Sequence, residues 1–186
     1  MNEMNTAKRT VLCAMCIALC YVLPLAFHGV GLGSALSPMH IPVLLCGLIC
    51  GGTSGLLCGI VGPALSSLLS GMPPMMMLIR MIPELAVYGL TAGLAMKLIK
   101  TGKLALDTYL SLVIAMFAGR IAGGIATAIF FSVTSGVYSF ALWAAGYFIE
   151  GIPGIVAHLI LVPILTFALH RARLLPVRYP GTEVTG

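Results

Sequence analysis

Long apolar stretches with very few charged side chains dominate the chain. Of its 186 residues, 60% are hydrophobic and 8% are charged, and the mean hydropathy is +1.09. A soluble domain carries about 25% charged residues, so this chain lacks the charged surface that a water-soluble globule needs. It is also too apolar to remain disordered in water. We therefore predict an integral membrane protein whose mass lies almost entirely within the bilayer.

The number of membrane crossings depends on one ambiguous region. A transmembrane helix needs about 20 apolar residues, and the chain length accommodates about six. The apolar region from His40 to Leu69 reads either as one long helix or as two short helices folded at Gly51–Gly55. Short segments interrupted by glycine and proline often mark a binding site in transporters.

The distribution of basic residues decides between the two readings. Cytoplasmic loops are rich in lysine and arginine, and only the two-helix reading places all three basic clusters of the chain on the cytoplasmic side. The clusters are Lys8 and Arg9; Lys97, Lys100 and Lys103; and Arg171, Arg173 and Arg178. Because they do not form one patch, the net charge of +5 does not indicate nucleic-acid binding.

The sequence thus predicts an all-α integral membrane protein, a bundle of six transmembrane helices with both termini in the cytoplasm. We expect a single domain over residues 1–186. The expected spans are about 8–27, 40–52, 54–70, 77–99, 108–133 and 140–170.

Four ionisable side chains lie within or at the edge of these spans: Arg80, Glu84, Arg120 and Glu150. Each costs about 2.5–3.5 kcal/mol at a helix centre and usually faces a partner or a cavity. Arg80 and Glu84 are four residues apart and can pair on one helix face. Arg120 and Glu150 lie near mid-membrane. These groups either form internal salt bridges or line a polar cavity in the outer half of the membrane, and both can hold.

Histidine and aromatic residues add candidates to this set. His40 opens the second helix at the outer surface, and Tyr88 and Tyr147 could stack on a flat ligand. Aromatic residues near membrane interfaces usually act as anchors, so we expect Trp143 to be an anchor. Tyr147 lies deeper, beside Glu150.

Several motifs bear on chemistry that this chain could perform alone. The six cysteines all fall in the first three helices, and we interpret them as small packing residues, with no metal site. A phosphate-binding GxxxxGK[ST] loop is absent from the sequence. We therefore expect no cofactor on this chain and no enzymatic activity, with energy supplied by another chain or an ion gradient.

One motif suggests a protease as a remote alternative. Gly52–Gly55 reads GTSG, which fits the GxSG serine motif of intramembrane rhomboid proteases, with Ser54 as nucleophile and His158 as base. However, Ser54 falls in the expected cytoplasmic turn, where a serine that caps a helix explains the same residues.

The chain resembles the substrate-binding S component of an energy-coupling factor (ECF) transporter. The resemblance covers nearly the whole chain and rests on five segments. They read SPMHIPVLLCGLICG from Ser37, GPALSSLLSGMPPM from Gly62, MIPELAVYGL from Met81, the pair Gly119-Arg120, and EGIPGIVAHLILVP from Glu150.

The resemblance implies how the chain works. The subunit would bind a water-soluble vitamin or related micronutrient in an outer-half cavity, in a bacterial or archaeal cell membrane. A membrane T component and two cytoplasmic ATPases would drive import by hydrolysing ATP. Ala14 and Ala18 match the AxxxA face that contacts the T component in this family. The expected substrate-binding residues are His40, Arg80, Glu84, Tyr88, Arg120, Tyr147 and Glu150.

Two questions stay open at this point. The intramembrane charges balance, which favours a neutral or singly anionic substrate, and pantothenate is the first candidate. Riboflavin, a pyrimidine, a queuosine precursor and a corrinoid fragment are alternatives. The competing class is a stand-alone secondary transporter of a small solute, with Glu150 as the carboxylate for ion coupling.

Overall fold

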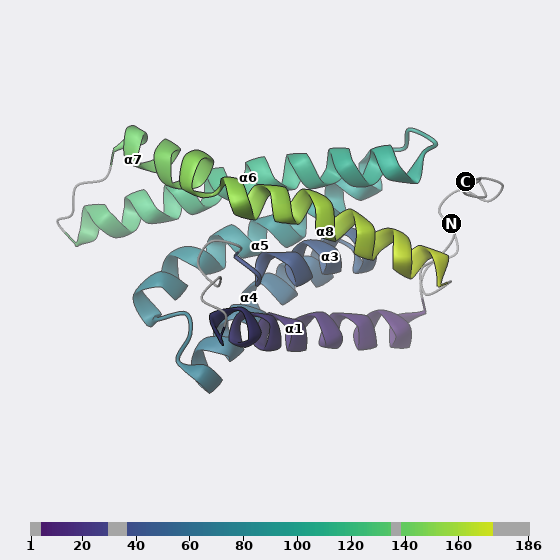
Figure 1. The fold of residues 1–186 in the computed structure, drawn as a ribbon, viewed down its shortest axis with the longest axis horizontal. Helices are drawn as coiled ribbons and strands as arrows, with labels where there is room; N and C mark the ends of the chain where they lie inside the picture. The colour runs from purple at the N-terminus through teal and green to yellow at the C-terminus, as the bar shows by residue number, and fades with distance from the viewer. Residues whose placement is uncertain (1–4, 30–36, 135–138, 173–186) are drawn as a thin grey trace.

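The computed structural model of the chain describes residues 5–29, 37–134 and 139–172. These residues are helical apart from short connections, and the helices run mostly along the long axis of the molecule (Figure 1). The helices are α1 (Thr6–Gly29), α3 (His40–Cys50), α4 (Gly52–Ser70), α5 (Met75–Leu98), α6 (Leu104–Val133), α7 (Phe140–Ala144), the π-helix η1 (Ala145–Glu150) and α8 (Ile152–Arg171).

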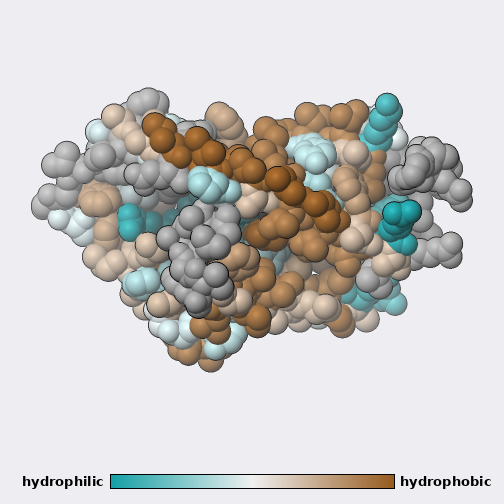
Figure 2. Space-filling view, viewed as in Figure 1, coloured by the Kyte–Doolittle hydropathy of each residue, from teal (hydrophilic) through white to brown (hydrophobic). Residues whose placement is uncertain are grey.

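Five of the described helices are long and apolar enough to cross a membrane: α1, α4, α5, α6 and α8. They carry large exposed apolar side chains such as Val11, Leu57 and Phe117, and Figure 2 shows the apolar surface that results. The structure therefore describes a multi-pass helical membrane protein. The expectation of six spans and cytoplasmic termini stays a prediction.

Helix α3 lies at the centre of the bundle. It is only 11 residues long, and every residue except Ile49 is buried. It packs against α1, α4, α5, α6 and α8. A helix this short would span about 16 Å, about half of the hydrocarbon core. Polar groups at its ends are thus held inside the molecule by the longer helices around it.

The region 40–70 contains two helices, as the two-helix interpretation predicts. They are joined at Gly51, whose φ of 93° favours glycine. The helices differ from the expectation further along the chain. The last expected span, 140–170, is divided into α7, η1 and α8. The new helix begins at Ile152 because Pro153 can occupy only the first turn of a helix without losing a hydrogen bond.

The basic clusters of the described chain share one end of the molecule. Figure 1 shows the start of α1, the turn between α5 and α6, and the end of α8 together at its right-hand end. Arg9 fixes the α3–α4 turn there as well, because its Nε donates to Ser54 Oγ (2.8 Å) and its Nη2 to Thr53 Oγ1 (2.6 Å). Arg173 and Arg178 lie outside the described residues.

Glycines bring α4 and α5 into backbone contact. A Cβ atom on Gly89 would overlap the carbonyl oxygen of Gly55, and one on Gly93 would overlap the backbone nitrogen of Gly52. Such small-residue faces allow membrane helices to approach closely. Because the clash is with backbone rather than with a flexible side chain, no local rearrangement can relieve it.

We expect Gly89→Ala to destabilise the protein by roughly 1–3 kcal/mol, the usual cost of overpacking a close contact. The measurement is the apparent melting temperature of the purified chain in detergent. Gly146→Ala is the matched control, because a Cβ at Gly146 meets no atom within 4 Å. Equal melting temperatures for the two variants would contradict the tight α4–α5 crossing.

Candidate ligand-binding site

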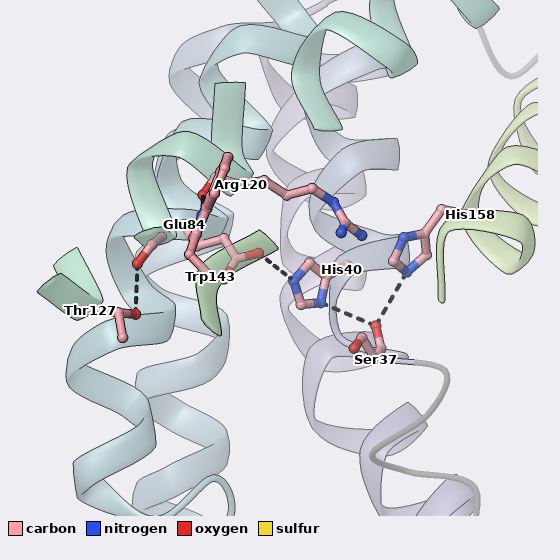
Figure 3. A network of polar contacts seen from close by, with 8 residues as sticks. Ser37, His40, Glu84, Arg120, Thr127, Trp143 and His158 are labelled. Carbon is pink, nitrogen blue, oxygen red and sulfur yellow. Dashed lines mark hydrogen bonds and ion pairs between the residues drawn. The ribbon is translucent and has the colours of Figure 1, made fainter. Parts of the chain in front are cut away.

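Two histidines and a glutamate meet at the start of α3. His40 Nε2 lies 3.6 Å from Glu84 Oε1 on α5, and His40 Nδ1 lies 3.2 Å from the carbonyl oxygen of Ser37. The same oxygen lies 3.4 Å from His158 Nε2 on α8. The two imidazole rings stack, with centroids 5.5 Å apart (Figure 3). Segments distant in sequence thus contribute to one buried polar cluster.

Tyr88 and Arg120 extend this cluster toward α6. Tyr88 stands one turn after Glu84 on α5, and its ring meets His40 edge-on at 5.2 Å. Arg120 is buried, and Figure 3 shows its side chain reaching toward the rings of His40 and His158. Four of the predicted binding residues, His40, Glu84, Tyr88 and Arg120, therefore lie in one region.

Two glycines of α6 make room for the aromatic walls of this site. A Cβ on Gly119 would lie 2.6 Å from Tyr88 Cδ2, and one on Gly124 would overlap the indole of Trp143. The Trp143 indole nitrogen donates to the carbonyl oxygen of Arg120 at 3.2 Å. Trp143 therefore contacts the site through the backbone of Arg120, a contact that its interpretation as an interface anchor does not include.

Arg80 lies away from this cluster. Its Nε donates to Met76 O at 3.3 Å, and its guanidinium lies 5.7 and 5.8 Å from the ring centroids of Phe130 and Phe131. Between the two described side chains there is no Arg80–Glu84 ion pair, so the predicted pairing is wrong. Glu84 faces His40 instead, because α3 places a basic group beside it.

Two further predicted site residues, Tyr147 and Glu150, fall in η1. The structure describes their backbone, but their side chains lie outside the described part of the chain. Their assignment as binding residues, and that of Glu150 as an ion-coupling carboxylate, stay predictions.

The geometry separates the two residues that the protease alternative requires. Ser54 Oγ accepts a hydrogen bond from Arg9 at the start of α4, whereas His158 contacts Ser37 and His40 at the opposite end of α3. The length of α3, about 16 Å, separates the two residues. His158 is therefore too far from Ser54 to act as its base.

The cysteines pack between α1, α3 and α4. All six are free thiols; the Sγ atoms of Cys20 and Cys58 are 4.0 Å apart, and Cys20 also contacts Met39 O at 3.9 Å. Among the described residues, no group of three or more His, Cys, Asp or Glu side chains could hold a metal ion.

Ala14 and Ala18 lie on the opposite side of α1 from this packing. Both are exposed, as are Val11, Met15 and Leu19 on the same helix, whereas Cys16 and Cys20 are buried. The predicted docking residues are thus on a surface that another helix could reach.

Sequence reasoning missed His158 and Ser37 as parts of the site. The GxSG motif points to His158 only as a protease base, although a histidine in an otherwise apolar helix is itself a signal of a polar partner. Ser37 contributes its backbone carbonyl oxygen. Every residue has such a group, so the sequence gives no signal that points to this one.

An apolar helical bundle with a buried cluster of ionisable groups is typical of membrane proteins that bind small solutes. The chain matches the family described as ECF transporter, substrate-specific component, over residues 8–166. It therefore belongs to this family, and the resemblance seen in the sequence is confirmed. No curated protein and no solved structure matched the chain.

Proposed function

We propose that this chain captures a water-soluble vitamin or related micronutrient for ATP-driven import into a bacterium or archaeon. The observation that carries the proposal is the meeting of His40, Glu84, Arg120 and His158 inside a chain of this transporter family. Polar groups in such a setting usually mark a substrate path. Tyr88 and Trp143 add flat faces against which a ligand can pack.

The charge distribution supports an outward-facing site. Cytoplasmic segments concentrate lysine and arginine, so the end of the molecule that carries Arg9, Lys100 and Arg171 is assigned to the cytoplasm. Arg9 binds the α3–α4 turn at that end, and His40 lies at the other end of α3. The site then lies in the outer half of the membrane, with both chain termini in the cytoplasm.

The partners follow from the family and from the exposed face of α1. A membrane T component would pack against Ala14 and Ala18, whose small side chains allow a close approach. Two cytoplasmic ATPases would supply the energy and hydrolyse the ATP, so that this chain needs no cofactor of its own.

Pantothenate is the first candidate substrate. A neutral or singly anionic compound suits the site because His40 already faces the Glu84 carboxylate, which leaves no large excess of one charge to neutralise. Its hydroxyl and amide groups offer hydrogen bonds to the buried polar side chains.

The proposal is tested by identifying the small molecule that co-purifies with the protein and by asking what drives its uptake. We expect mass spectrometry to find a vitamin-like compound, and uptake in cells to stop when the partner ATPases are inactivated. Uptake that persists without the ATPases but collapses with an uncoupler would instead favour the secondary transporter.

Substitution of the buried Arg120 should weaken ligand binding, whereas substitution of the half-buried Arg80 should not. Arg120→Lys keeps the positive charge but loses the planar guanidinium, and we expect a loss of affinity of about 10–100-fold, equivalent to a charged hydrogen bond of about 1.5–3 kcal/mol. Arg80→Lys is the control and should bind normally, because Arg80 packs on Phe130 and Phe131.

Binding of the co-purified compound is measured from the fluorescence of Trp143, the one tryptophan of the chain. Melting curves with and without the compound separate a loss of binding from a loss of fold. If Arg120→Lys and Arg80→Lys bound the compound with equal affinity, Arg120 would not be a residue of the binding site.

Ala14→Phe and Ala18→Phe should abolish uptake while leaving ligand binding to the isolated subunit intact. A phenylalanine fills the small-residue face and keeps the T component from approaching, but it points away from the site. Ala128→Phe on the exposed face of α6 is the matched control and should transport normally. Loss of binding in the α1 variants would show that this face is needed for internal packing instead.

A further inference from the structure

The side chains of the proposed site are enclosed by the rest of the chain. Their exposed fractions are 8% for His40, 9% for Glu84, 1% for Tyr88, 7% for Arg120 and 2% for His158. A solute in the outer aqueous phase cannot touch groups that are buried in this way unless part of the chain moves. If these residues bind a substrate, a segment next to them must therefore open and close.

The outer half of the last span is divided into short elements. It consists of α7 and η1, together the outer segment (residues 140–150), which pack mainly against each other and against α8. Figure 1 shows α7 at the end of the molecule opposite the basic clusters, the end that the proposed function assigns to the outside. A π-helical turn within a span often accompanies a functional site. Short elements with few packing partners are also the ones that open locally.

A hinge is available where the outer segment meets α8. Gly151, which has no side chain, ends η1 and precedes α8. Pro153 lies in the first turn of α8 and has no N–H group, so it cannot donate a hydrogen bond back to η1. The backbone hydrogen bonding is therefore weakened at this junction, and the outer segment can turn about it while α8 stays intact.

Trp143 fastens the outer segment to α6. Its indole nitrogen donates to the carbonyl oxygen of Arg120 at 3.2 Å (Figure 3), and a Cβ atom on Gly124 would overlap the indole. Residues 120 and 124 are about one helical turn apart, so the indole lies against the turn that carries the Arg120 side chain. We call this contact of Trp143 with Gly124 and Arg120 the latch. It requires the absence of a side chain at position 124.

We infer that the outer segment is a gate over the substrate site, with its hinge at Gly151 and its latch at Trp143. The inference rests on the proposed function, in which the buried cluster is the substrate site. The closed segment separates the cluster from the outside, and the open segment admits or releases a solute. In this role Trp143 is a positioning residue, because it acts by holding the segment in place.

A gate changes the rates of binding more than the affinity. A weaker latch raises the open fraction of both the free and the loaded protein, so a solute enters and leaves faster. The two effects offset each other in the dissociation constant. Loss of one neutral hydrogen bond changes such an equilibrium by about 2–10-fold, and this is the change that we expect in each rate constant.

The gate can be tested without a ligand, by hydrogen exchange of the full-length chain in detergent with detection by mass spectrometry. Gly124→Ala should displace the indole and speed exchange in peptides from residues 140–150, while peptides from α3 and α5 keep their protection. Ile125→Ala is the matched control and should leave exchange unchanged, because Ile125 is 57% exposed on α6. Unchanged exchange in residues 140–150 of Gly124→Ala, or an equal increase in α3 and α5, would overturn the inference.

Trp143→Phe provides a second variant in case Gly124→Ala does not fold. Phenylalanine keeps an aromatic ring but has no N–H group to donate to the carbonyl oxygen of Arg120. We expect the same faster exchange, confined to residues 140–150. Exchange equal to that of the unmodified chain would show that the indole does not hold the segment.

The consequence for binding is measured with radiolabelled pantothenate. The association and dissociation rate constants should both rise about 2–10-fold in Gly124→Ala and in Trp143→Phe, with a smaller change in Kd. Faster dissociation without faster association would show that these residues only shape the site, and would overturn the gate. If pantothenate binds to none of the proteins, the substrate assignment fails, and hydrogen exchange still decides whether the segment opens at the latch.

Discussion

The bilayer offers no hydrogen-bonding partner to a polar side chain in its core, and this constraint organises the molecule. Polar groups that cannot reach water must find one another inside the bundle. Here they do so at the N-terminal end of α3, the helix that the longer helices enclose. His40, Glu84 and His158 come from three helices, and the carbonyl oxygen of Ser37 joins two of them. The polar contacts of the site therefore form only when these helices pack together.

The structure also connects the exposed face of α1 to this site. One side of α1 presents Ala14 and Ala18, and the other side packs cysteines against α3 and α4. Cys20 on the packed side contacts the carbonyl oxygen of Met39, the residue before His40. A partner that moves α1 would thus act on the segment that positions the imidazole. The close α4–α5 crossing at Gly55 and Gly89 would serve as the frame for such a movement.

Much of this arrangement could be predicted from the sequence, because hydrocarbon makes both apolar spans and buried charges conspicuous. Glu84 and Arg120 stand out as charges that do not belong in lipid, whereas His40 and Tyr88 stand out for a position at the outer start of a helix and for an aromatic face. The pairing between them could not be found in this way. Arg80 and Glu84 are four residues apart, but the rings of Phe130 and Phe131, fifty residues later, hold the arginine instead. Trp143 joins the site because Gly124 leaves space for it, a contact that only the tertiary structure reveals.

The placement of His40 beside Glu84 explains how ionisable groups can persist in this setting. A lone charge is costly in surroundings of low dielectric constant, whereas an acid and a base that lie side by side offset part of that cost for each other. Removing one partner would leave the other buried and uncompensated, which is more costly than removing both. The same surroundings weaken the screening between such groups and any charge on a bound solute. Groups that stabilise one another in the bundle are therefore also well placed to act on a solute that reaches them.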